Sequence, residues 1–415
     1  MHLTHLSLSN FRSFARLDIQ IPGGPVLLVG GNAQGKTTIL EAIFYLATFT
    51  SFQADHDRQL ISFILEKEPL AVARIVAEFR HAPDLSTTNQ TIRSSHRFEI
   101  RLIREPNGFE GVSRFRKEIL LDGVNRKNSE AIGVFNAVLF QPQMLRVVEG
   151  SPDDRRRFLN LAISQVEPHY SGFLIDYQRT LIQRNALLKT LAERGGDAEQ
   201  LSYWDEQISR LGAEIICARI HAIKELECIG TKTHRELTRG HEVLRLEYQP
   251  SFDPLENQSI PSQQYTLPIR TVVDRTRLTA GEIRQLFLDK LQRIRTSEIA
   301  RGVTTIGPHR DDLRFLSNGI DLGVYGSRGQ ARTAILSLKL AELSWMKSKT
   351  GQWPVILLDE VLAELDPERR TDLLERLQDC EQALLTTTDL HQFPTQYVNS
   401  ATLWQIQFGQ VILSQ

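Results

Sequence analysis

The chain has 415 residues, and its 49 lysines and arginines are balanced by 50 aspartates and glutamates. This balance excludes a polycation that coats nucleic acid through bulk charge, so any DNA contact must come from a local basic surface. At ~150 residues per domain the length predicts two or three domains. Three scattered cysteines form neither a zinc pattern nor a disulfide framework, and no apolar run reaches the ~18 residues of a membrane span. We therefore expect a cytoplasmic protein.

The first fifty residues predict strands that lead into a glycine-rich loop. Residues 3–9 and 17–21 alternate as strands do, and residues 26–29 form an apolar run typical of a buried strand in a parallel sheet. A glycine-rich loop follows, and residues 39–46 then have helical spacing. Strand, glycine loop and helix in this order are the context of a phosphate-binding loop.

That loop contains the pattern Gly30-x-x-x-x-Gly35-Lys36-Thr37. Backbone N–H groups of such a loop point at phosphates, the lysine reaches the β- and γ-phosphates, and the hydroxyl binds Mg²⁺. The alternative is an incidental glycine-rich turn. The predicted cofactors are ATP and Mg²⁺. The residues predicted to hold the nucleotide are Gly30, Gly31, Asn32, Ala33, Gln34, Gly35, Lys36, Thr37 and Thr38.

The middle of the chain changes from strand-like to helical patterns. Residues 70–80, 96–104 and 117–121 predict an antiparallel meander. Residues 155–239 have helical spacing that is broken at Gly195-Gly196-Asp197, which predicts a helical hairpin. A proline-containing loop at 249–266, a helix at 280–295 and, from residue 301, short strands and helices complete the pattern.

Two further motifs lie near the C-terminus. Residues 355–358 are apolar and precede Asp359 and Glu360, as in a buried strand that places carboxylates at the ligand-binding edge of an α/β sheet. Asp359 can hold Mg²⁺ and Glu360 can act as general base, unless this is only a solvated acidic turn. Residues 325–330 form a Ser/Gly turn before a helix, which predicts either a second anion site or a capped surface helix. The predicted catalytic residues are Glu360, Lys36 and Asp359.

The order of these motifs resembles the ABC-type ATPase head of the SMC-like branch. A long insertion separates Lys36 from Asp359, unlike the compact heads of transporters. Within that branch the chain is similar to the RecF family. The stretches that carry this similarity are residues 8–14, 31–37, 149–152, 155–159, 307–312 and 327–330.

The resemblance implies an α/β fold, an ABC-type ATPase head of the SMC-like RecF type, with a mostly helical second lobe that bears a short helical arm. Residues 1–150 are expected to form the N-terminal part of the ATPase lobe with the phosphate loop. Residues 151–300 are expected to form the helical lobe II with its hairpin arm. Residues 301–415 are expected to form the C-terminal part of the ATPase lobe with the signature and Walker B motifs.

In that family two heads sandwich two nucleotides, so the resemblance implies an ATP-dependent homodimer. Ser327, Gly329 and Gln330 are expected at the γ-phosphate that the other chain holds with Lys36. Because diphosphate lacks this group, hydrolysis would weaken the dimer. Asp366 is expected in the loop that crosses the dimer interface.

Further residue roles come only from the resemblance. Arg12 is expected beside the adenine or the phosphates, and Gln141 in the lid loop that couples Mg²⁺ to the second lobe. Many ABC heads carry a histidine after the strand that follows the Asp-Glu pair. Here Thr388, Asp389 and His391 stand near that position, so one of them is the expected γ-phosphate sensor, or His391 is a surface histidine.

The implied function is recombinational DNA repair, with weak ATP hydrolysis that acts as a switch. The protein would bind gapped duplex DNA or single-strand/double-strand junctions and would assist RecA loading with RecR and RecO. The alternative is an SMC-like structural DNA clamp or tether ATPase. Residues 155–239 are too short for a long coiled-coil tether at ~1.5 Å per residue. A kinase needs no Ser-x-Gly-Gln turn, and a transport motor needs membrane partners.

Basic residues are the candidates for DNA contact, through phosphates and not through bases. Each group also has acids nearby, so an ordinary solvated face is an equal alternative. The basic run 155–157 can pair with acids of the arm, and residues 309–312 are expected to form a structural turn instead of a metal site. The candidates are Arg93, Arg97, Arg101 and Arg104, then Arg114, Arg116 and Lys117, then Arg293, Arg295 and Arg301.

Overall fold

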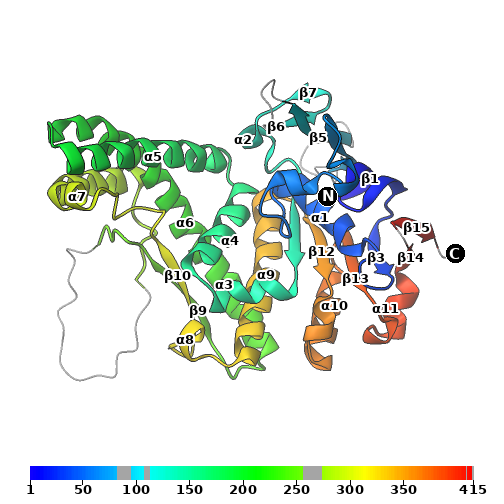
Figure 1. Ribbon diagram of the computed structural model, residues 1–415. Helices are drawn as coiled ribbons and strands as arrows, with labels where there is room; N and C mark the ends of the chain where they lie inside the picture. Colours follow the sequence, from blue (N-terminus) through cyan, green and yellow to red (C-terminus); the bar gives the residue numbers. More distant parts are fainter. Residues whose placement is uncertain (82–94, 107–112, 256–272, 408, 414–415) are drawn as a thin grey trace, which may run out of the picture. The chain divides into compact units, whose positions relative to one another are not determined.

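The computed structural model describes residues 1–81, 95–106, 113–255, 273–407 and 409–413 (Figure 1). The chain divides into two compact units. The first contains Met1–Gln143 and Met346–Gln415, and the second contains Met144–Trp345. Residues 301–345, which we assigned to the C-terminal part of the ATPase lobe, therefore pack within the second unit. Arg93 and much of the loop predicted at 249–266 lie outside the described residues.

An antiparallel sheet in the first unit has the strand order β2-β1-β4-β5-β6-β7. Its strands are β1 (His2–Phe11), β2 (Phe14–Gln20), β4 (Ala71–Arg80), β5 (Ser95–Pro106), β6 (Ser113–Leu121) and β7 (Val124–Asn125). Alternate side chains of β1, such as Leu6 and Leu8, are fully buried. The predicted meander is confirmed, and one face of each strand supplies the core because side chains alternate across a sheet.

The second sheet of this unit has the order β15-β14-β3-β13-β12-β8. Its strands are β3 (Gly24–Val29), β8 (Ala137–Phe140), β12 (Val355–Asp359), β13 (Gln382–Thr387), β14 (Thr402–Gln407) and β15 (Gln410–Leu413). All pairs are parallel except β14 with β15. Residues 26–28 and 355–358 are almost completely buried, as expected for parallel strands covered on both faces. The carboxyl ends of the five parallel strands share one edge, where the candidate site lies.

Helices and short 3₁₀ turns complete the first unit. The helix that follows β3 is the most buried of them, since eleven of its thirteen residues are buried or nearly so. These elements are α1 (Lys36–Thr48), η1 (Asp57–Leu60), η2 (Phe63–Leu65), α2 (Asn128–Ala131), η5 (Val361–Glu364), α10 (Pro367–Leu377), η6 (Leu390–Gln392) and α11 (Thr395–Ser400), with η3 (Pro142–Leu145) at the boundary between the units.

The second unit is mostly helical, with one small antiparallel sheet of order β11-β10-β9. The predicted hairpin is confirmed: α5 and α6 are separated at Gly195 and Gly196, and α7 packs against both of them (Figure 1). The elements are α3 (Arg146–Glu149), α4 (Pro152–Ser164), α5 (Tyr170–Arg194), η4 (Ala198–Gln200), α6 (Leu201–Leu237), β9 (Leu244–Gln249), α7 (Ala280–Arg301), β10 (Asp312–Ser317), β11 (Ile320–Asp321) and α8 (Leu322–Tyr325), and α9 (Arg328–Thr350) runs into the first unit.

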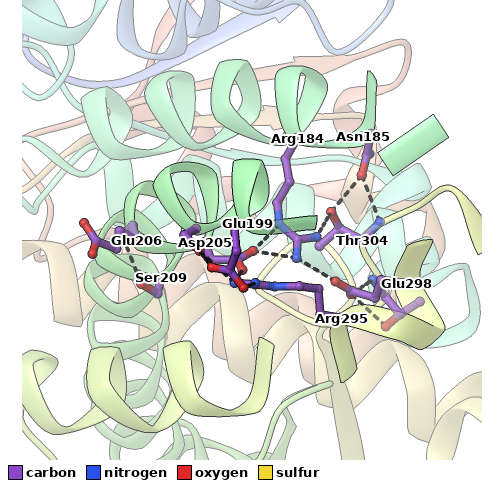
Figure 2. Close-up of polar contacts among 11 residues, drawn as sticks. Arg184, Asn185, Glu199, Asp205, Glu206, Ser209, Arg295, Glu298 and Thr304 are labelled. Atoms are coloured by element: carbon purple, nitrogen blue, oxygen red, sulfur yellow. Dashed lines mark hydrogen bonds and ion pairs between the residues drawn. The ribbon is translucent and has the colours of Figure 1, made fainter. Parts of the chain in front are cut away.

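A buried polar layer joins the three helices α5, α6 and α7 (Figure 2). Arg184 of α5 donates from Nε to Asp205 Oδ1 of α6 at 2.9 Å and pairs with Glu298 Oε2 of α7 at 2.7 Å. Arg295 of α7 donates to Asp205 Oδ2 at 2.9 Å. Arg184, Asp205 and Glu298 are fully shielded from solvent. Removal of one partner of a buried ion pair is costly, so we expect this layer to hold the packing of the three helices.

Candidate nucleotide-binding site

Local backbone geometry explains both glycines of the phosphate loop. The loop leaves β3 at Gly30, whose N–H donates to the Thr387 carbonyl at 3.3 Å. A Cβ at Gly30 would collide with the Ile406 carbonyl oxygen, and a Cβ at Gly35 would collide with the Phe14 ring. Gly35 also has φ +107° at the start of α1, a conformation that side chains disfavour. The loop can therefore take this shape only with glycine at both positions.

The Lys36 ammonium lies within this loop. Its Nζ donates to the carbonyl oxygens of Gly30 at 2.7 Å and Gly31 at 2.9 Å, and lies 3.5 Å from Glu360 Oε1. The lysine is 4% exposed, whereas the Glu360 side chain is 44% exposed. A cation held by carbonyl oxygens at a helix N-terminus is placed where phosphate oxygens of a nucleotide can replace those partners.

A hydroxyl–carboxylate cluster lies at the end of β12. Thr37 Oγ1 and Thr386 Oγ1 each donate to Asp359 Oδ1 at 2.8 Å. Burial raises the pKa of the Asp359 carboxyl, while these two hydrogen bonds oppose the rise. Glu360 follows with φ +53°, and its N–H donates to Thr386 Oγ1 at 3.0 Å. The cluster presents hydroxyl and carboxylate oxygens, the ligands that Mg²⁺ prefers, so Thr37 and Asp359 fit this ion.

Gln141 leaves the neighbouring strand at the same edge. Phe140 of β8 pairs with Leu358 of β12, so Gln141 and Asp359 each follow this pair by one residue. The first unit thus brings Lys36, Thr37, Gln141, Asp359 and Glu360 to one sheet edge. Among the residues that the structure describes, no group of three or more His, Cys, Asp or Glu side chains suits a metal ion. A metal here would need hydroxyl, water or nucleotide oxygens as well.

Arg12 makes contacts that support the loop helix. Its guanidinium donates to both oxygens of Glu41, at 2.7 and 2.9 Å, and to the Gln59 carbonyl at 3.2 Å. Glu41 belongs to α1 and is fully buried. A bidentate pair with a buried carboxylate is a strong, oriented interaction. The structure thus gives Arg12 a role in anchoring α1, and its contact with a nucleotide stays a prediction.

The predicted signature turn lies in the second unit. Ser327 Oγ accepts from Gln330 N at 3.2 Å, and Gln330 Oε1 accepts from Ser327 N at 3.1 Å, so the two residues cap α9 reciprocally. Gln330 Nε2 also donates to Glu242 Oε1 at 3.1 Å. Ser327 and Gly329 are exposed. A capping box that holds exposed backbone N–H groups is compatible with either of the interpretations of this turn.

The three candidate sensors differ in their surroundings. Thr388 is exposed immediately after β13, and Asp389 accepts from the His391 N–H at 2.9 Å through Oδ1, which caps η6. His391 is exposed. Asp366 caps α10 by accepting from Arg369 N at 3.0 Å. These roles as sensor and interface residues stay predictions.

Two residues at the site were missed by sequence reasoning. Thr386 holds Asp359 and Glu360, and Glu41 anchors Arg12. A hydroxyl near the end of an apolar strand was a signal for Thr386. Its neighbours depend on β13 lying between β3 and β12, which the local sequence does not encode.

Most of the candidate DNA-binding cations are engaged within the protein. Arg101 pairs with Glu99 at 2.6 Å, Lys117 with Asp57 at 2.9 Å and Arg116 with Glu118 at 3.2 Å. Further partners are the carbonyl oxygens of residues 65 and 66 for Arg104, Glu105 for Arg114, and Glu199 and Asp205 for Arg295. The candidates with exposed side chains are Arg97, Arg114, Arg116, Arg293 and Arg301.

The stretch 309–312, for which we predicted a structural turn, contains turn residues at 309 and 310 and the start of β10 at Asp312. Asp311 is buried and accepts from Ser251 N at 2.8 Å and from Tyr248 Oη. Asp312 pairs with Arg155 at 2.6 Å, so this arginine does not pair with the arm. His309 Nδ1 lies 2.8 Å from Tyr177 Oη, and burial lowers the pKa of His309 to about 4. These polar groups are used inside the second unit.

Comparisons with known proteins identify the family. The family model described as RecF/RecN/SMC N terminal domain matches residues 2–405. The DNA replication and repair protein RecF of Roseiflexus castenholzii is 36% identical over 99% of both chains, and that of Chloroflexus aurantiacus is also 36% identical over 99% of both. The chain belongs to the RecF family.

Solved RecF structures agree with this assignment. A structure of the recombination mediator protein RecF-ATPrS in the RecFOR pathway has a TM-score of 0.80 and 28% identity, and covers 100% of this chain and 98% of that one. The RecF-ATP structure has a TM-score of 0.78, also at 28% identity. The predicted fold class, an SMC-like ABC-type ATPase head of RecF type, is confirmed. No helix in the described part of this RecF-family chain is long and apolar enough to cross a membrane.

Proposed function

We propose that this RecF-family protein binds ATP with Mg²⁺ and hydrolyses it weakly as a switch for DNA repair. The observation that carries the proposal is the meeting of Lys36, Thr37, Asp359 and Glu360 at the carboxyl edge of the parallel sheet. These residues come from both ends of the chain. In the folded first unit they meet at one edge of the sheet.

Each of these residues has a definite task in the proposed reaction. Lys36 exchanges its carbonyl partners for β- and γ-phosphate oxygens. Thr37 and Asp359 would hold Mg²⁺, which would neutralise charge on the phosphates. Glu360 takes a proton from the attacking water, and its accessible carboxylate is compatible with this task.

The ATP-bound form would be a homodimer. Ser327 and Gly329 are exposed at the capped start of α9, so the Ser327 hydroxyl and the Gly329 N–H can meet the γ-phosphate bound by a second copy. Loss of that phosphate removes the contact, and the dimer weakens. The free energy of this contact then couples ATP hydrolysis to dissociation of the dimer.

We further propose that the dimer holds gapped duplex DNA or single-strand/double-strand junctions and assists RecA loading with RecR and RecO. Support comes from the family and from its relatives, which are described as DNA replication and repair proteins and as part of a RecFOR pathway. Exposed Arg97, Arg293 and Arg301 are the preferred phosphate contacts, since several of the other candidates are committed to ion pairs or carbonyl oxygens inside the protein.

The test is binding to labelled gapped duplex DNA with ATP, with ADP and without nucleotide, over a salt series. We expect ATP to tighten binding, and log K to fall linearly with log salt because phosphate contacts release counterions. ATP binding is measured in parallel with a fluorescent nucleotide. Normal ATP binding with DNA affinity that is absent or independent of nucleotide would refute the DNA switch and leave the ATPase assignment intact.

A further inference from the structure

The hydroxyl of Thr386 is shared by the two acidic residues at the end of β12. Thr386 lies on β13, between β3 and β12, where it pairs with Leu28 on one side and Asp359 on the other. Its Oγ1 donates to Asp359 Oδ1 at 2.8 Å and accepts from the Glu360 N–H at 3.0 Å. The side chain is 4% exposed. One buried hydroxyl thus contacts both the predicted metal ligand and the backbone of the predicted general base.

The backbone at Glu360 needs such support. Its φ of +53° lies in the left-handed region, which residues with a Cβ seldom adopt and which persists only where neighbours fix it. The hydrogen bond from Glu360 N to Thr386 fixes the peptide that enters this residue. The direction in which the Glu360 carboxylate leaves the strand follows from that peptide.

The Asp359 carboxylate receives two hydroxyl donors on the same oxygen. One comes from Thr37 and the other from Thr386. A metal ion at Thr37 would bind a lone pair of that hydroxyl and leave its O–H to donate to Asp359. Thr386 lies on the neighbouring strand and donates to the same oxygen, so it helps to keep the carboxylate oriented.

A hydroxyl at this buried strand position is explained by its partners. Valine has the same shape and suits a buried strand, and a buried hydroxyl is unfavourable unless it is hydrogen-bonded. The next residue, Thr387, points the other way and bonds to the backbone of Asp389. Thr386 Oγ1 also lies 3.5 Å from the Leu358 carbonyl oxygen, so its shorter hydrogen bond is the one to Asp359.

We propose that Thr386 is a positioning residue for nucleotide hydrolysis, whose single hydroxyl orients Asp359 for Mg²⁺ and fixes Glu360 as general base. The inference rests on the proposed ATPase function. It predicts that loss of the hydroxyl impairs the metal-dependent steps and spares metal-independent nucleotide binding, because the Lys36 ammonium is held by the carbonyl oxygens of Gly30 and Gly31.

The experiment compares full-length wild type with Thr386→Val, Thr386→Ser and Thr48→Val. Thr48 is a buried threonine at the far end of α1 whose hydroxyl donates to the Phe44 carbonyl at 2.9 Å. Affinity for a fluorescent ATP analogue is measured in EDTA and across a Mg²⁺ titration, and kcat and KM for ATP are measured at saturating Mg²⁺. Circular dichroism and thermal unfolding confirm that each variant is folded.

For T386V we expect kcat to fall and the Mg²⁺ concentration for half-maximal tightening to rise, each by about 10- to 100-fold, as is usual for residues that orient metal ligands. Affinity in EDTA should stay close to that of wild type. T386S, which keeps the hydroxyl, should recover most of both losses, and T48V should match wild type in all three measurements.

Unchanged kcat and Mg²⁺ dependence in folded T386V would overturn the proposal. So would a T386S variant as impaired as T386V, since the effect would then follow the methyl group. If T386V does not fold, Thr386→Ala against T386S makes the same comparison. Failure of wild type to bind or hydrolyse ATP would instead refute the ATPase function, which the same series reports separately.

Discussion

The Arg184→Met substitution tests the buried polar layer of the three-helix arm. Arg184 is fully buried and donates to Asp205 through Nε and Nη2, at 2.9 and 2.7 Å. It also donates to Thr304 Oγ1 at 2.7 Å and pairs with Glu298. Methionine fills a similar volume without charge, so the substitution leaves carboxylates buried without their main cation.

The expected loss in the free energy of unfolding depends on the partners that the two carboxylates keep after the substitution. Removing one partner of a buried ion pair costs about 3–5 kcal/mol, because the charge left behind is uncompensated. Asp205 keeps Arg295, and Glu298 keeps the N–H and hydroxyl of Thr305 at 2.6 and 2.9 Å. We therefore expect the lower end of the range, about 3 kcal/mol.

The assay is urea unfolding followed by circular dichroism, together with amide hydrogen exchange of α5, α6 and α7. Arg179→Met is the matched control on α5, because Arg179 is exposed and pairs loosely with Asp176 at 3.6 Å; it should cost less than about 1 kcal/mol. Adding Glu298→Gln to R184M should recover part of the loss. A cost for R184M no larger than for R179M, or strict additivity with E298Q, would refute the idea that this layer fixes the arm.

Four further outcomes are expected. Lys36→Ala should abolish ATP binding in a fluorescence titration; normal affinity would contradict the phosphate-loop assignment. Glu360→Gln should keep ATP and accumulate dimer in light scattering while hydrolysis stalls, and unchanged turnover would exclude Glu360 as the base. Ser327→Arg should block the ATP-dependent dimer yet leave nucleotide binding by the monomer intact; a normal dimer would speak against contact in trans. The pKa of His309 is lowered to about 4 from its ordinary 6.5, so as the pH falls the unfolded chain binds a proton at this histidine before the folded chain does. Stability should then fall by up to about 3 kcal/mol as pH drops from ~6.5 to ~4, and His309→Gln should flatten that part of the urea-unfolding profile.

Motifs whose meaning is local could be predicted from the sequence. The phosphate loop is one, because the strand, both glycines and the helix lie within about twenty consecutive residues and their geometry is set by short-range sterics. The apolar run 355–358 is another, since an unbroken series of apolar residues indicates a strand that is buried on both faces. The helical hairpin was predictable for the same reason: periodicity and a Gly-Gly break are features of the adjacent chain.

The division of the chain depends on packing partners that are far away in sequence. Residues 301–345 contain short strands, turns and helices, a pattern that suits either part of the protein. β10 within this range pairs with β9, in register from Asp312 with Gln249 to Ser317 with Leu244. Partner choice of this kind depends on which apolar faces meet, and the periodicity of one strand does not specify it. The range thus packs with the second unit.

The ion-pair partners of the basic residues could not be predicted from the sequence either. Arg74, Glu99, Arg101 and Glu118 come from three strands, yet their carboxylates and guanidinium groups form one chain of ion pairs across the sheet. Two arginines lower the pKa of Glu99 to about 2. The sequence displays these residues as separate clusters of mixed charge, and only the strand register makes them neighbours. An arginine held in this way would exchange a carboxylate for a phosphate on binding DNA, whereas Arg97 on the same strand is exposed. Neutralising Arg97 should therefore reduce DNA affinity and the salt slope more than neutralising Arg101, and the reverse order would show that the ion-pair chain opens on DNA.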